Sequence, residues 1–175
     1  MNRKYEFTGE TRNWVGRTLH RIRAVRDFGD VKAGDLGGWI ETESNLSNDG
    51  NAWVYGNAMV YGNADVSGNA EVSVNARVYG NAEVSGNAWV YGDARVYGRK
   101  HILWISMIGS RDDTVTFMRA KDEKIIVAAG CFGGTIDEFS EKVKEKHGDN
   151  EHGKAYRLAI ELAKLRIDLD KEETK

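Results

Sequence analysis

Valine and alanine recur with a six-residue period between Asn51 and Gly98, separated by polar residues and glycines. Eight consecutive units follow the pattern Asn-Ala-x-Val-(Tyr/Ser)-Gly; Val74 replaces one of the glycines and Asp93 one of the asparagines. A period of six does not fit an α-helix with 3.6 residues per turn. It predicts very short strands at the valines, joined by Gly-Asn corners, with the valines and alanines pointing inward.

The Val-x-Gly-Asn-Ala-x pattern resembles the hexapeptide-repeat superfamily of left-handed parallel β-helices. In that architecture three units close one triangular coil, so eight units make about 2.7 regular coils. The preceding residues 27–34, 37–40 and 46–47 resemble the opening of the YdcK-like hexapeptide proteins, a group of bacterial transferase-like chains. The whole layout is also similar to small proteins of bacteriophage and prophage genomes.

Residues that lie 18 apart share one face of this prism. One face is aromatic and predicts an interface through Trp53, Tyr55, Trp89 and Tyr91. The next face combines a tyrosine ladder with arginines: Tyr61, Tyr79, Tyr97, Arg77 and Arg95. The third face is small and acidic. Exposed aromatic stripes favour packing against another subunit or against the chain's own terminal segments. In the alternative interpretation, the arginines bind an anion and the tyrosines stack on a ring.

The segments on either side of the repeat differ from it. Residues 1–50 predict extended segments at 5–7 and 18–28 and an irregular first coil that contains Val31, Leu36, Ile40 and Leu46. The arginines between residues 17 and 26 are balanced by acids elsewhere in this segment. We therefore expect them to form solvated or intersubunit ion pairs rather than a nucleic-acid site.

Residues 99–175 predict three strands, at 101–108, 114–119 and 124–129, followed by two helices. Thr135 and Glu138 have the spacing of a capping box, and Gly148 is a natural helix end. The second helix would begin at Asp149-Asn150 and pack through an apolar stripe of Ala155, Leu158, Leu162, Leu165 and Leu169. This β-β-β-α-α module is expected to cover the last coil of the prism.

The predicted fold is therefore mainly β: a short left-handed parallel β-helix with an irregular lead-in and a C-terminal α+β module. The predicted domains are residues 1–50, 51–98 and 99–175.

A glycine-rich segment, residues 130–135, lies between a predicted strand and a predicted helix. Free backbone amides there could bind an anion at Gly133, Gly134 and Thr135, with Arg111 and Lys121 as countercharges. A tight strand-to-helix turn explains the same glycines. Cys131 has no partner at a spacing that would identify a nucleophile.

Resemblance to hexapeptide acyltransferases, which use an acyl-CoA donor, implies a histidine general base in or beside the coils. The four histidines, His20, His101, His147 and His152, all lie outside the repeat. We therefore predict no catalytic residue and no cofactor. The last two histidines are separated by a helix break, so we predict no metal site.

The chain has 175 residues, with 25 lysines and arginines against 27 acids, so no bulk positive charge attracts nucleic acid. A single cysteine and the lack of an apolar run of about 18 residues predict a soluble, cytoplasmic protein with no membrane partner. The predicted function is a non-enzymatic phage-type binding protein that antagonises a host process. It would form a homo-oligomer, as trimers are common in the resembled superfamily, and bind a host protein or a small anionic, nucleotide-like ligand. The alternatives are an acyltransferase and a structural or assembly protein.

Overall fold

The computed structural model describes residues 3–170, so the outermost residues of the first and last predicted domains lie outside it. The chain forms two compact units, which divide between Arg99 and Lys100.

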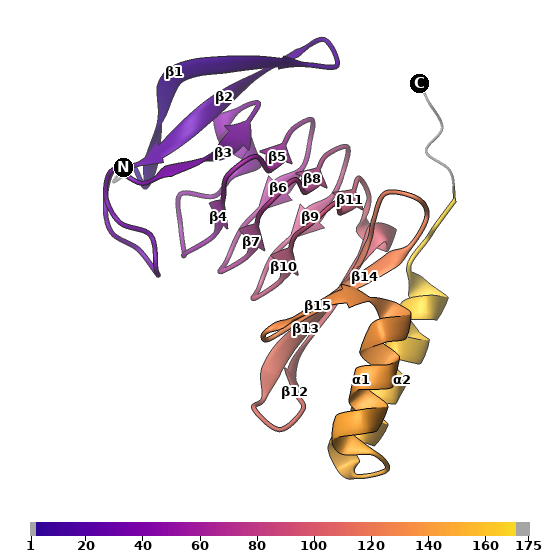
Figure 1. The fold of residues 1–175 in the computed structure, drawn as a ribbon. Coiled ribbons are helices and arrows are strands. Elements are labelled where there is room, and N and C mark those ends of the chain that lie inside the picture. The colour runs from indigo at the N-terminus through magenta and orange to yellow at the C-terminus, as the bar shows by residue number, and fades with distance from the viewer. Residues whose placement is uncertain (1–2, 171–175) are drawn as a thin grey trace. The chain divides into compact units, whose positions relative to one another are not determined.

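Eight two-residue strands, one in each hexapeptide, stack in rows in the first unit (Figure 1). They are β4 (Trp53–Val54), β5 (Met59–Val60), β6 (Asp65–Val66), β7 (Glu71–Val72), β8 (Arg77–Val78), β9 (Glu83–Val84), β10 (Trp89–Val90) and β11 (Arg95–Val96). Each strand from β4 to β8 pairs in parallel with the strand 18 residues later. The repeat valines of these strands are fully buried. The predicted β-solenoid of about three turns is confirmed.

The corners between these strands repeat one backbone conformation. Glycines such as Gly56 and Gly86 have positive φ angles between 59° and 69°. Val74, which replaces a glycine, has a φ of 65° and keeps this conformation although it is β-branched. Corner asparagines of successive coils hydrogen-bond to one another, as Asn51 does to Asn69 at 3.1 Å.

An irregular lead-in coil precedes the regular ones, as predicted. It contains β3 (Leu36–Ile40) and a short 3-10 helix (Glu43–Asn45), and β3 pairs in parallel with β5. Ile40 and Leu46 are buried, and they pair in parallel with Val60 and Val66 of the first regular coil. Leu36, at the start of β3, belongs to this coil as predicted, and its side chain is 55% exposed.

A long hairpin formed by β1 (Tyr5–Trp14) and β2 (Arg17–Ala24) precedes the lead-in coil. The sequence predicted extended structure only as far as Phe7, because β1 has no regular apolar alternation. Val15 and Gly16 both have positive φ angles and form the two-residue turn that joins the strands. The hairpin adds two antiparallel strands to one sheet of the solenoid, which then has the order β1-β2-β3-β5-β8-β11.

The arginines of β2 form ion pairs within the chain. Arg17 contacts Glu41 at 2.9 Å, and Arg23 contacts Glu6 at 2.5 Å. These pairs neutralise much of the basic strand without a second subunit.

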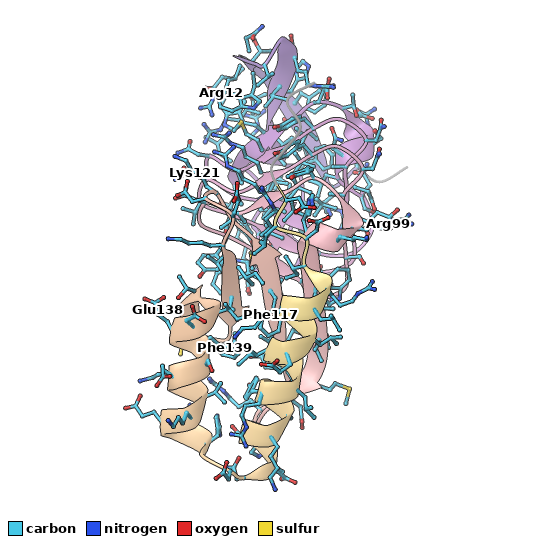
Figure 2. All side chains as sticks on the ribbon, turned by 90° about the vertical axis from the view of Figure 1, so that its right-hand side faces the viewer. Arg12, Arg99, Phe117, Lys121, Glu138 and Phe139 are labelled. Atoms are coloured by element: carbon cyan, nitrogen blue, oxygen red, sulfur yellow. The ribbon has the colours of Figure 1, made fainter. Side chains whose placement is uncertain are left out.

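The second unit begins with a short 3-10 helix (Arg99–His101) that spans its boundary, and contains a four-stranded antiparallel sheet and two helices (Figure 2). In sheet order these elements are β12 (Ile102–Ile108), β13 (Asp113–Arg119), β14 (Ile125–Ala129) and β15 (Phe132–Thr135), followed by α1 (Ile136–His147) and α2 (Glu151–Arg166). Phe117 and Phe139 meet edge-to-face in the core between sheet and helices, with ring centroids 6.1 Å apart. The three predicted strands are confirmed, and β15 is a fourth strand that the sequence did not predict.

Both helix starts follow the predicted chemistry. Thr135 and Glu138 form the capping box of α1, and Gly148 ends the helix with a φ of 51°. The Asn150 side chain accepts a hydrogen bond from the Gly153 amide at the start of α2.

The predicted packing face of α2 is only partly confirmed: Ala155 and Leu169 pack against the core, but the three leucines between them do not. Leu158, Leu162 and Leu165 are exposed, by 73%, 42% and 81%. The helix instead buries Ala159, Ile160 and Ala163, as well as Gly153. Small side chains allow the helix to approach its neighbours closely, and a β-carbon at Gly153 would overlap the Gly148 carbonyl. The face of α2 that packs is therefore the one with small residues, which allow close approach, and not the one with most leucines.

Candidate functional site

A cleft of about 240 Å³ lies in the second unit, between the β12–β13 turn, the β14–β15 turn and α1. Its lining includes Arg111, Phe132, Phe139, Lys142, Lys146 and Tyr156. The Phe132 and Phe139 rings are 5.1 Å apart, and the Tyr156 ring meets Phe139 edge-to-face at 5.4 Å. These three rings give the cleft aromatic walls.

Three cations line the same cleft: Arg111 from a turn, and Lys142 and Lys146 from successive turns of α1. Arg111 lies over Gly130, where an added β-carbon would be 3.3 Å from its Nη2 atom. Lys142 pairs with Glu145 at 3.0 Å, and Asp113 is the acid in the cleft lining. The lining therefore has an excess of positive charge beside aromatic rings.

Two further groups in the cleft have shifted pKa values. Burial and the nearby Asp113 raise the pKa of Tyr156, although Arg111 opposes this shift. Burial and the positive charge of Lys146 lower the pKa of His147. At neutral pH the phenol is therefore a neutral hydrogen-bond donor and the imidazole is uncharged. A β-carbon at Gly109 would overlap the Tyr156 hydroxyl, so this glycine provides the space for it.

The structure corrects the predicted anion loop at 130–135. Gly133 and Gly134 lie in strand β15, paired with Ala128 and Val127, and do not present a row of free loop amides. The Thr135 amide donates to the Glu138 carboxylate at 2.7 Å, and the Thr135 hydroxyl accepts from the Glu138 amide. The Thr135 amide and hydroxyl both donate to the Glu138 carboxylate, and these two hydrogen bonds lower the pKa of Glu138. The Glu138 carboxylate thus takes the position at the start of α1 where an anion was predicted to bind.

Arg111 and Lys121 do not come together. Arg111 lies in the turn before β13, whereas Lys121 lies in the turn after it. A seven-residue strand of about 23 Å separates the two turns. Of the predicted ligand residues of the second unit, only Arg111 lines the cleft.

The tyrosine ladder, Tyr61, Tyr79 and Tyr97, exists as a stack in the first unit. Ring centroids are 5.0 Å apart for the first pair and 5.3 Å for the second. Tyr61 is buried with Leu19 and Trp39. The prediction that the ladder tyrosines stack on a ligand ring is therefore wrong for Tyr61. The three rings pack on one another, and the chain's own N-terminal strands cover Tyr61.

The aromatic face is also partly covered by the chain itself. Trp53 is 1% exposed, and Phe28 and Tyr5 contact it edge-to-face. Of the two partners predicted for this face, Trp53 therefore packs against the chain's own N-terminal segment and is not exposed to another subunit. Trp89 and Tyr91 are half-buried, with ring centroids 5.4 Å apart, and Tyr55, two coils earlier on the same face, is also half-buried.

Sequence reasoning missed most of the cleft. Lys142 and Lys146 are spaced four residues apart on α1, beside the apolar face of Phe139 and Val143, and this spacing was a usable signal. No pattern in the sequence indicated that Tyr156 of α2 would meet the turn around Gly109. Within residues 3–170, no group of three or more potential metal ligands gathers. No helix in that range is long and apolar enough to cross a membrane.

Comparison with known proteins identifies the repeats. Residues 52–68 and 76–92 match the YdcK beta solenoid repeat. The chain is also 43% identical over 51 residues to a protein of Escherichia coli strain K12 named uncharacterized acetyltransferase YdcK. That match covers 29% of this chain and 15% of the relative. Together with the observed solenoid, these matches show that the chain contains β-solenoid repeats of the YdcK type.

Proposed function

We propose that this protein is a non-enzymatic binding protein that captures a small ring-bearing anion in the cleft of its second unit. The observation that carries the proposal is the combination of aromatic walls with Arg111, Lys142 and Lys146. The rings would pack on a planar apolar group, and the cations would bind a carboxylate or phosphate. Mononucleotides belong to this class of ligand.

The size of the cleft supports a small ligand. Its 240 Å³ is below the range of about 300–1,000 Å³ typical of drug-sized ligands. A single ring system with one anionic group is therefore a better match than a dinucleotide or an extended coenzyme.

A thermal-shift panel of mononucleotides and aromatic carboxylates tests the proposal. A ligand that binds only the folded protein raises its melting temperature. We expect at least one compound to do so, and Arg111→Ala to abolish the rise. Lys121→Ala removes an equal charge outside the cleft and should leave the rise intact. Failure of the whole panel, or equal loss in both variants, would contradict the proposal.

Acetyl transfer is a second candidate, favoured by the name of the Escherichia coli relative. His147, with its lowered pKa, supplies a neutral imidazole in the cleft, as a general base requires. Release of free coenzyme A from acetyl-coenzyme A, lost in His147→Gln, would support this candidate. No release with a broad panel of amine and hydroxyl acceptors, together with no thermal shift by acetyl-coenzyme A, would argue against it.

The biological setting of the proposal is a phage-type protein acting in a bacterial host, assembled as a homo-oligomer. The half-buried Tyr55, Trp89 and Tyr91 support an interface on the aromatic face. Native mass spectrometry of the protein purified from its host would report both the subunit number and a retained ligand. A trimer that falls apart in Tyr91→Ala would support this interface, whereas a monomer would exclude it.

A further inference from the structure

Four arginines lie on the outer face of the six-stranded sheet in the first unit. Arg21 is opposite Trp39 in the strand register, Trp39 is opposite Met59, and Met59 is opposite Arg77. Arg77 is in turn opposite Arg95. Because cross-strand partners project to the same side of a sheet, these residues form one line. Arg12 joins the line through its contact with Trp39, and the four are named the arginine row: Arg12, Arg21, Arg77 and Arg95.

Aromatic rings hold most of these guanidinium groups in place. Arg12 and Arg21 lie 4.3 Å and 5.4 Å from the centre of the Trp39 ring. Arg77 lies 4.3 Å from the centre of the Trp14 ring. When the flat face of a guanidinium packs on an aromatic ring, the N–H groups at the edge of the guanidinium stay available for hydrogen bonding.

The row forms few salt bridges within the described part of the chain. There, Arg12, Arg77 and Arg95 form no salt bridge, and Arg21 has one long contact of 3.9 Å with Glu10. Burial and the neighbouring Arg95 lower the pKa of Arg77, although Tyr61, Tyr79 and the nearby Asp93 oppose this shift. The buried Arg21 Nε and Trp39 Nε1 atoms also have no hydrogen-bond partner. Like charges held side by side at cross-strand distance destabilise the fold unless an anion joins them.

The aromatic rings beside the row are already in contact with other groups. Trp39 is 2% exposed and packs against two arginines, and Trp14 packs against Arg77. The ladder tyrosines stack on one another. Non-specific binding of single-stranded nucleic acid depends on bases stacking on open aromatic faces. The row instead offers guanidinium edges, which form bidentate pairs with carboxylates as well as with phosphates.

We propose that the arginine row docks an acidic segment of a partner protein, with Arg77 and Arg95 binding its aspartate or glutamate carboxylates. This surface is separate from the ligand cleft and depends on residues of the first unit alone.

A fluorescent peptide of ten glutamates provides the probe for a binding titration with the full chain at low and moderate salt. We expect binding that weakens as salt rises and that falls at least tenfold in the double variant Arg77→Gln/Arg95→Gln. The single variant Arg95→Gln, which leaves the packing of Arg77 on Trp14 intact, should show a several-fold loss. Arg99→Gln is the matched control, because this exposed arginine pairs with Glu83 and stands outside the row.

Thermal melting of each variant shows whether it remains folded. No binding of the peptide at low salt would overturn the proposal, as would equal losses in the control and the double variant. Tighter binding of an oligothymidine of equal charge would also overturn it, and would identify nucleic acid as the partner class.

Discussion

The solenoid and the C-terminal unit bury their cores in different ways. In the solenoid, each inward position repeats every six residues, so valine packs on valine and alanine on alanine from coil to coil. In the C-terminal unit, each core residue has a position that occurs once, such as Phe117 against Phe139. A repeated core divides its stability into many small equal contributions, whereas a unique core concentrates it in a few large side chains.

Matched deletions in the two cores test this contrast most strongly. Phe117→Ala should lower the free energy of unfolding by about 3–5 kcal/mol, because the phenyl ring is fully buried. Val72→Ala, in the middle coil, should cost about 2 kcal/mol, because it removes two buried carbons. Urea denaturation followed by circular dichroism measures both. Equal losses would contradict the contrast.

A buried lysine at the start of the solenoid should make stability depend on pH. The Lys4 ammonium donates to the Ala52 carbonyl at 2.8 Å, and burial lowers its pKa to about 8. Between about pH 8 and 10.5 the unfolded chain holds a proton that the folded chain has lost, so the free energy of unfolding rises with pH. The expected rise is about 2 kcal/mol from about pH 7 to pH 9.5.

Lys4→Met should abolish this rise and serves as the control. Tyr5 and Tyr55, whose pKa values burial raises to about 12, act in the opposite direction only above about pH 10, where unfolded tyrosines ionise. A slope that persists in Lys4→Met would assign the effect to another group.

The smallest expected effect concerns the corner of the solenoid at which valine replaces glycine. Val74 has a φ of 65°, a conformation that suits glycine. Val74→Gly should therefore stabilise the protein, by about 1 kcal/mol, since relief of strain exceeds the entropy cost of glycine. Gly56→Val, at a corner with open space and a φ of 59°, should destabilise it by a similar amount. Thermal melting of the two variants should give shifts of opposite sign.

The same contrast explains what the sequence could predict. The hexapeptide pattern placed every strand from Trp53 to Val96 and the three faces, because one local rule repeats eight times. Capping residues likewise located both helices. The orientation of α2 could not be predicted from the sequence. Gly153 and Ala159 form the packed face in place of Leu158 because neighbouring backbone lies close to the helix, and the sequence does not show that closeness.

The candidate site was predicted only at Arg111. Its other residues belong to two turns, the adjoining strands and two helices, and their meeting depends on tertiary packing around Tyr156. The covering of Tyr61 and Trp53 was missed for a related reason. Strand β1 has no regular apolar alternation, so nothing local showed how far the N-terminal hairpin would extend.

The 18-residue register also limits how such a gene can change in length. An insertion or deletion of one whole coil returns every later residue to its own face, because Glu71 already occupies the register position of both Trp53 and Trp89. A change of six residues keeps the interior filled but rotates everything downstream by one face, which would set acids where tyrosines had been. Length variants that retain the surface chemistry should therefore differ by multiples of eighteen.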